Sequence, residues 1–155
     1  MTATRKPSQI DSATRRMLAA DLFNHVWTFL ETPHRTPEQD EEMLHAAHAS
    51  RHHWGEIGQP ANLARGEWQC SRVYAVLGRA EPALWHARRC LAICEANGIA
   101  GWDIAAGYEA LARAHLVAGD LDAVAIWKAK GYEALAPIAD LEDREIIGSD
   151  LATLP

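Results

Sequence analysis

The sequence predicts an all-α protein, and three observations carry this prediction. Alanine, the strongest helix former, accounts for 29 of the 155 residues. Apolar residues recur at helical spacing along the chain, whereas no alternating segment bounded by turns indicates a strand. Proline and glycine stand between the periodic segments, where helices are expected to end.

Seven helices are expected, and each has a start or a stop signal. Residues 1–10 precede them and are predicted to form a flexible tail, while residues 11–155 are predicted to form a single helical domain. Thr36 followed by Pro37 is a typical helix start, and Asp120 and Asp140 are good caps. The expected helices run from Asp11 or Ser12 to Leu30, from Pro37 to Gly55 or Gly58, from Pro60 to Leu77, from Glu81 to Asn97, from Trp102 to Ala118, from Asp120 to about Ala136, and from Asp140 onward.

Composition and charge exclude several classes of function. Hydrophobic residues make up 48% of the chain and charged residues 23%, as in ordinary globular proteins. No apolar run approaches the roughly 20 residues of a membrane span, so we expect no membrane partner. The net charge of −6 is opposite to that of a nucleic-acid binder, so we expect no nucleic-acid partner. Three cysteines and no hydrophobic leader favour reduced thiols and a cytoplasmic location.

Two stretches of the chain share one pattern around a glycine. A large residue lies four positions before Gly78 and before Gly119, a small or modest apolar residue five positions after, and another small residue seven further on. These residues are Tyr74, Ala83 and Cys90 around Gly78, and His115, Val124 and Gly131 around Gly119. The pattern resembles the tetratricopeptide repeat, although 41 residues separate the glycines where the usual period is about 34.

The resemblance implies a fold. It predicts a tetratricopeptide-like α-solenoid of about three helical hairpins, stacked with a right-handed twist, with the seventh helix capping the C-terminal end. The first two helices form a degenerate first repeat, because Pro33 and Pro37 replace the glycine turn. A helical bundle without repeats is the alternative.

The resemblance also implies a groove, because the first helix of each hairpin lines the concave face in this family. The groove residues that we expect to bind a partner are Arg65, Trp68, Gln69, Arg72, Glu109 and Arg113. Guanidinium groups bind carboxylates through paired hydrogen bonds, and an indole offers flat apolar area. The sequence therefore predicts an anionic partner, such as an acidic peptide, a chain terminus or a small carboxylate. Alternatively, the arginines are solvated or pair with Glu67 and Glu109.

A second candidate site is a stripe of potential metal ligands on the second expected helix. Its members are Glu41, His45, His48 and His52, which fall within an arc of about 60°. Imidazole suits zinc, copper, iron or nickel, so a divalent transition metal is the expected cofactor if the stripe is a site. A helix supplies only two or three ligands to one ion, so a partner is needed, and His25, His34, His86 and His115 are candidates. Otherwise the histidines are solvated or line a contact between repeats.

His86, Cys90 and Cys94 follow one another at intervals of four residues and could form a further set of metal ligands. We interpret Cys90 as a small core residue rather than a ligand.

The first functional interpretation of the sequence is a protein- or peptide-interaction module, and such a small unit either serves as an adaptor or forms a homodimer. A small metal-binding protein or metalloenzyme is the alternative, and a binder of a small ligand within the helical stack is the second alternative. No phosphate loop or nucleophile elbow indicates an enzyme.

Overall fold

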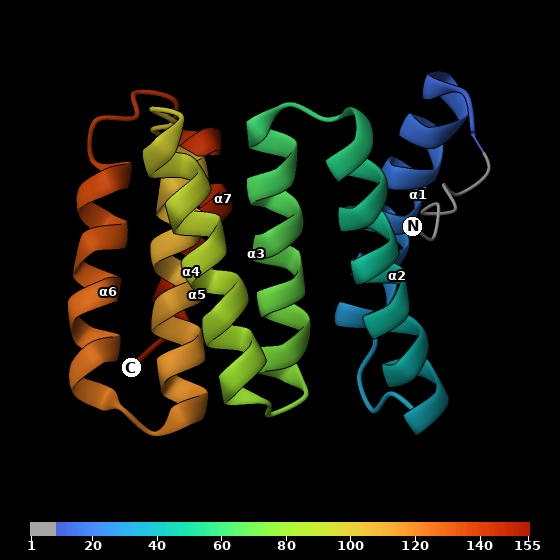
Figure 1. Ribbon diagram of the computed structural model, residues 1–155. Helices are drawn as coiled ribbons and strands as arrows, with labels where there is room; N and C mark the ends of the chain where they lie inside the picture. Colours follow the sequence, from blue (N-terminus) through green and yellow to red (C-terminus); the bar gives the residue numbers. More distant parts are fainter. Residues whose placement is uncertain (1–8) are drawn as a thin grey trace, which may run out of the picture.

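The computed structural model describes residues 9–155, which form seven α-helices and no strand (Figure 1). The predicted number, order and type of elements are therefore confirmed for these residues. The tail expected over residues 1–10 lies, up to residue 8, outside the described residues. The helices are α1 (Ser12–Leu30), α2 (Pro37–Ile57), α3 (Pro60–Val76), α4 (Ala80–Ala96), α5 (Trp102–Ala118), α6 (Leu121–Leu135) and α7 (Leu141–Ala152).

The helix ends follow the local signals in the sequence. The side chain of Thr36 accepts a hydrogen bond from the Gln39 backbone, and the Gln39 side chain accepts one from the Thr36 backbone, which closes a capping box at α2. Asp120 and Asp140 accept hydrogen bonds from the third backbone N–H of α6 and α7. Gly119 ends α5 in the left-handed region, at φ 80°, where a side chain would be strained.

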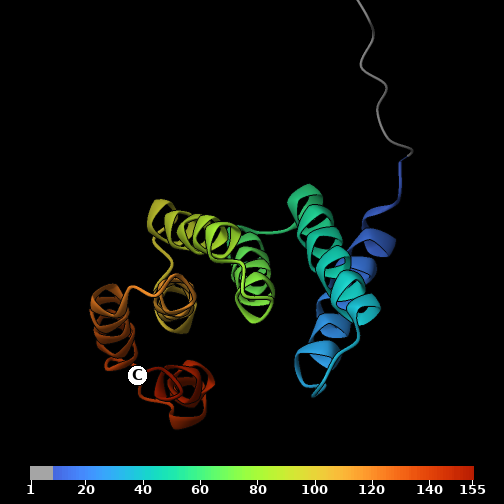
Figure 2. The same ribbon diagram turned by 90° about the horizontal axis from the view of Figure 1, so that it is seen from below.

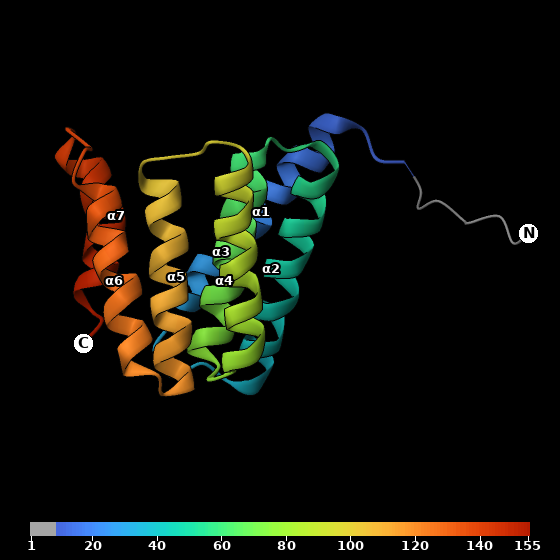
Figure 3. The same cartoon turned by 60° about the vertical axis from the view of Figure 1, so that its left-hand side comes forward.

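Consecutive helices pack side by side and are joined at alternate ends, so α1–α2, α3–α4 and α5–α6 are antiparallel hairpins (Figures 1 and 3). Seen from below, the row of hairpins bends into an arc (Figure 2). Helices α1, α3, α5 and α7 lie on the inner side of the arc, and α2, α4 and α6 lie on the outer side. We call the inner side the concave face and the outer side the convex face.

Two apolar clusters hold most of the core. The larger one extends from α3 to the C-terminus and includes Leu91 and Leu111, and the smaller one joins α1 and α2 through Val26 and Met43. Cys90 is buried in the larger cluster, in agreement with its interpretation as a small core residue. None of the helices within residues 9–155 combines the length and the apolar character that a membrane span requires.

Helix α7 is firmly packed at the C-terminal end of the row. Ile147, Leu151 and Leu154 are buried against α5 and α6. Gly131 makes room for α7, because a Cβ atom at this position would lie 2.9 Å from a methyl group of Leu151. The Lys128 Nζ atom donates a hydrogen bond to the Leu154 carbonyl at 2.8 Å. The last helix therefore belongs to the folded core and closes one end of the concave face.

Candidate functional site on the concave face

The six residues expected in the groove all lie on the two inner helices α3 and α5. Intervals of three and four residues place Arg65, Trp68, Gln69 and Arg72 on one side of α3, and Glu109 and Arg113 on one side of α5. The structure brings most of them into contact, because α3 and α5 pack directly against each other.

Glu109 is the centre of this cluster. Its side chain is buried completely and accepts hydrogen bonds from Arg72 Nη1 at 3.1 Å and from Arg113 Nε at 2.5 Å. Its second oxygen accepts a hydrogen bond from Trp68 Nε1 at 3.4 Å. A buried carboxylate needs such partners, since an unpaired charge in the interior is very costly. Glu109 is thus a structural centre of the concave face rather than a free ligand group.

Helix α7 completes the pairing of the two arginines. Arg72 Nη2 also donates to the Asp150 carboxylate at 3.2 Å. Arg113 Nη2 donates to the Asp150 backbone carbonyl at 3.0 Å and to the Thr153 hydroxyl at 2.8 Å. Both guanidinium groups are therefore engaged by the chain itself.

Arg65 has a partner of its own at the start of α5. Its Nε and Nη2 atoms donate to the two carboxylate oxygens of Asp103, at 2.8 and 3.1 Å. Its guanidinium group also lies 4.4 Å from the ring centre of Trp102. The three arginines thus face three carboxylates, those of Asp103, Glu109 and Asp150.

The prediction of an open arginine cluster for an anionic partner finds no support in these contacts. The alternative, pairing within the chain, is what the structure contains, with Glu109 as one of the acceptors. Glu67 instead pairs with Arg51 and His86. The sequence pattern could not show whether the groove arginines are free or paired, because the position of Asp150 depends on how α7 folds back on α5.

Gln69 is also committed to the fold. Its Nε2 atom donates to the Phe23 carbonyl at 2.9 Å and so joins α3 to α1. Its Oε1 atom is buried and has no hydrogen-bond partner among the described residues. With 1% of its surface exposed, Gln69 offers a partner no direct contact.

Aromatic and aliphatic side chains line the main cavity of the concave face. The cavity measures about 450 Å³ and lies between α1, α3, α5 and α7. It is lined by Phe23, Trp27, Arg65, Trp68, Trp102, Ile146, Ile147 and Asp150. The Trp27 and Trp68 rings lie 5.5 Å apart, and Ile146 is 48% exposed. Within this lining the arginine and the aspartate are both paired, so the accessible surface is largely apolar.

A smaller cavity of about 150 Å³ continues the concave face towards the start of α3. It shares Phe23 and Arg65 with the main cavity and is otherwise lined by Ala20, Asn24, Trp54 and Asn62. The two cavities therefore form a series along α1 and α3.

Sequence reasoning identified Arg65 and Trp68 in this lining but missed Trp27, Trp102 and Ile146. Trp27 follows Phe23 by four residues, a spacing that places two aromatic rings on one helix face, and this signal was available. Ile146 gave no local signal, because it faces the cavity only through the docking of α7.

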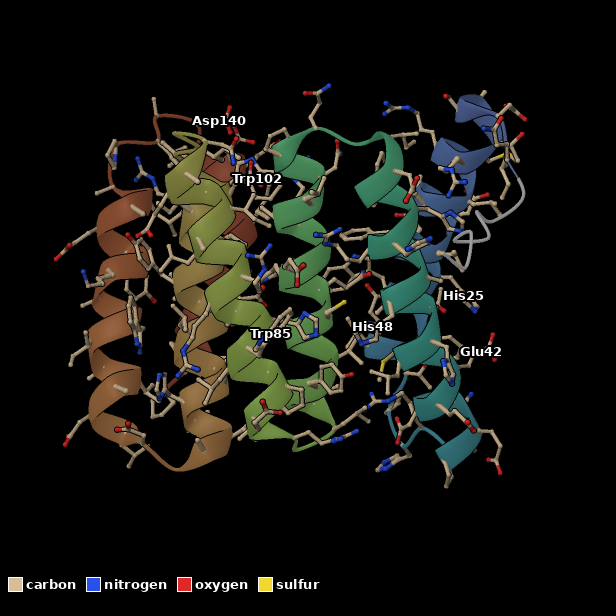
Figure 4. All side chains as sticks on the ribbon, viewed as in Figure 1. His25, Glu42, His48, Trp85, Trp102 and Asp140 are labelled. Carbon is tan, nitrogen blue, oxygen red and sulfur yellow. The ribbon has the colours of Figure 1, made fainter. Side chains whose placement is uncertain are left out.

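The four residues of the predicted metal stripe do not converge on one point. Glu41 and His45 are exposed and lie 3.8 Å apart, and His52 is exposed beside His53. His48 alone turns towards α3, where its Nε2 atom lies 2.8 Å from the Tyr74 hydroxyl (Figure 4). Within residues 9–155 no group of three or more His, Cys, Asp or Glu side chains is arranged to hold a metal ion. The stripe as a whole therefore has no geometric support as a metal site.

A polar cluster surrounds His48 on the convex face. His86 of α4 lies beside it, with its Nδ1 atom 2.6 Å from a carboxylate oxygen of Glu67. Arg51 Nε donates to the other Glu67 oxygen at 2.9 Å. Gly66 permits this approach, since a Cβ atom there would lie 2.7 Å from the Arg51 side chain.

Burial and charge set the protonation of this cluster. Burial lowers the pKa of His48, and its electrostatic interaction with His86 lowers it further, while Glu67 opposes both effects. Burial raises the pKa of Glu67, but its hydrogen bonds and electrostatic interactions with His86 and Arg51 outweigh this effect, so the pKa of Glu67 is lowered overall. Glu67 is therefore ionised and His48 is neutral near pH 7.

We compared the chain with protein-family models, curated proteins and solved structures, and none of them matches it. The class that fold and site define is an all-α protein of stacked helical hairpins with an apolar, aromatic-lined cavity on its concave face.

Proposed function

We propose that this protein is an interaction module of the tetratricopeptide-like helical-repeat class, and that it binds a protein or peptide partner on its concave face. The arrangement of inner and outer helices supports the class, since each hairpin contributes one helix to each side. The single observation that carries the function is the aromatic-lined cavity of about 450 Å³ between α1, α3, α5 and α7. Exposed apolar surface of this kind marks binding sites in soluble proteins.

The contacts favour an apolar anchor on the partner over an anionic one. Arg65 and Arg72 are already held by carboxylates of the chain, so an incoming carboxylate would have to displace them. The half-buried Trp27 and Trp102 instead offer flat apolar area that loses water on binding, next to the buried Trp68. An aromatic or aliphatic side chain of a partner, inserted into the cavity that these rings line, suits the site best.

The series of two cavities supports a peptide more than a compact molecule. An extended segment whose anchor occupies the main cavity would continue along α1 and α3 into the smaller one, past Phe23 and Arg65. A small apolar ligand is the second candidate, because the volume of the main cavity lies within the usual range for ligand pockets, about 300–1,000 Å³.

The test is a selection of random peptides displayed on phage against the purified full chain, followed by calorimetry with the synthesised peptides. We expect enriched peptides to carry an aromatic or aliphatic residue, and Ile146→Glu to weaken their binding at least about 10-fold because it places a charge in the lining. Leu141→Glu is the matched control, since Leu141 lies on the same helix, is 69% exposed and is not part of the lining. Equal affinity for both variants, or no enrichment, would refute the proposal.

A screen of small aromatic and aliphatic fragments by protein-detected NMR distinguishes the second candidate. The small-ligand binder would be favoured if fragments bind tightly in the cavity and no peptides are enriched. Peptide binding that Ile146→Glu weakens would favour the interaction module.

A further inference from the structure

His48 and His86 come together from two helices that are not consecutive in the chain. His48 lies on α2 and His86 on α4, and their ring centres are 5.3 Å apart. Figure 4 shows His48 on the side of α2 that faces α3, and Trp85, the neighbour of His86, on α4. The pair lies on the convex face and is separate from the cavity of the proposed function.

Each ring has one nitrogen fixed by a neighbour. The Nδ1 atom of His86 is held by Glu67, which is 4% exposed and is itself fixed by Arg51. The Nε2 atom of His48 is held by the hydroxyl of Tyr74. This leaves His86 Nε2 and His48 Nδ1 available, and a carboxylate behind an imidazole is the usual device that orients a metal-bound histidine.

The spacing of the two rings suits a shared ion. Two imidazoles that bind one tetrahedral ion at about 2.0–2.1 Å place their ring centres roughly 5 Å apart. A cavity of about 270 Å³, lined by Glu81, Pro82, Trp85 and His86, lies beside His86 and opens its ring to solvent.

We propose that His48 and His86 form a two-histidine site for one divalent transition-metal ion, such as Zn²⁺, Cu²⁺ or Ni²⁺. Glu67 is a positioning residue that orients His86, and water completes the coordination. The ion would link α2 to α4 across α3 and so tie the first hairpin to the second. Of the predicted stripe, the site retains His48 and replaces the other three members by a histidine from another helix.

The charges around the pair are compatible with a bound cation. Glu67 is negative, and Arg51 balances it at 2.9 Å. Glu81 lies at the wall of the neighbouring cavity and adds a second negative charge near the entrance. The guanidinium group of Arg79 lies over the Tyr74 ring, 5.4 Å from its centre.

The experiment is a calorimetric titration of the untagged full chain with ZnCl₂, together with thermal unfolding with and without zinc. We expect one ion per chain, an increase in Tm with zinc, and loss of both effects in His48→Gln and in His86→Gln. Glu67→Gln should weaken zinc binding about 10- to 100-fold while leaving one site per chain. His45→Gln and His52→Gln are the matched controls on α2 and should bind zinc as the unmodified chain does.

Three results would overturn the proposal. Binding that survives both His48→Gln and His86→Gln would place the ion elsewhere. Binding that is lost only in His45→Gln or His52→Gln would favour the exposed stripe. No heat of binding up to about 1 mM zinc would leave the cluster as a polar network without a metal. If His86→Gln fails to fold, His48→Gln alone decides, because His48 is half-buried and contacts only the Tyr74 hydroxyl through hydrogen bonding.

Discussion

Arg72 of α3 donates a hydrogen bond to Glu109 of α5 across 3.1 Å, and Glu109 is buried completely. This ion pair fixes the two inner helices to each other at the middle of the concave face. It also removes from that face the positive charge that the sequence pattern suggested. The accessible chemistry of the face is therefore left to the aromatic residues around it.

Replacing Glu109 by glutamine should destabilise the protein by about 3–5 kcal/mol, because Arg72 and Arg113 would both lose the buried negative charge that pairs with them. Urea-induced unfolding followed by circular dichroism measures this loss. Glu145→Gln, on the exposed side of α7, is the control and should change the free energy of unfolding by less than about 0.5 kcal/mol. Equal stability of the two variants would mean that the network contributes little.

Leu91→Ala should lower the free energy of unfolding by about 2–5 kcal/mol, the range for a large-to-small change in a packed core. Leu91 is 9% exposed and belongs to the larger apolar cluster. Leu121→Ala is the comparison, since Leu121 is 61% exposed on α6. A loss below about 0.5 kcal/mol for Leu91→Ala would contradict the assigned packing.

Stability should fall as the pH drops below about 6.5, the ordinary pKa of histidine. The pKa of His48 is lowered in the folded protein, so the unfolded chain binds more protons between that lowered pKa and 6.5. Thermal unfolding at pH 7.5, 6.5 and 5.5 measures the effect. His53, whose pKa is lowered by its own burial and by Arg15, contributes in the same direction.

His48→Gln should therefore reduce the pH dependence without abolishing it, whereas His45→Gln, at an exposed position, should leave it unchanged. The lowered pKa of Glu67 acts in a separate window, because it stabilises the fold above about pH 4.3 and is lost only at lower pH. An unchanged pH profile in His48→Gln would show that the cluster does not titrate as described.

The three cysteines should resist thiol reagents in the folded protein. Cys70, Cys90 and Cys94 are free and buried. Burial raises the pKa of Cys70 to about 12, and the hydrogen bond with Cys94 together with burial raises that of Cys90. Titration with Ellman's reagent at pH 8 should detect no fast-reacting thiol, and three in 6 M guanidinium chloride.

One fast equivalent in the native protein would contradict this prediction and would point to Cys94. Its hydrogen bond with Cys90 lowers its pKa, so only its burial protects it. Reaction at Cys94 would therefore indicate local opening of the end of α4.

The sequence by itself determined the helices, since the interactions that form and end them are local. Thr36 and Gln39 close a capping box within four residues, and Gly119 ends α5 through its own backbone conformation. The groove residues followed from the resemblance to the tetratricopeptide repeat, and their spacings of three and four residues place them on one side of α3 and of α5. Of these residues, Arg65 and Trp68 line the cavity.

Only the tertiary structure decided which of these side chains are free to bind and which are paired. Arg72 and Asp150 are 78 residues apart in the chain, and they meet because α7 packs back on α5. His48 and His86 meet because α2 and α4 both pack against α3. A helix is fixed by hydrogen bonds within four residues, whereas the neutralisation of a charge depends on which distant helix packs against it, and no local pattern encodes that choice.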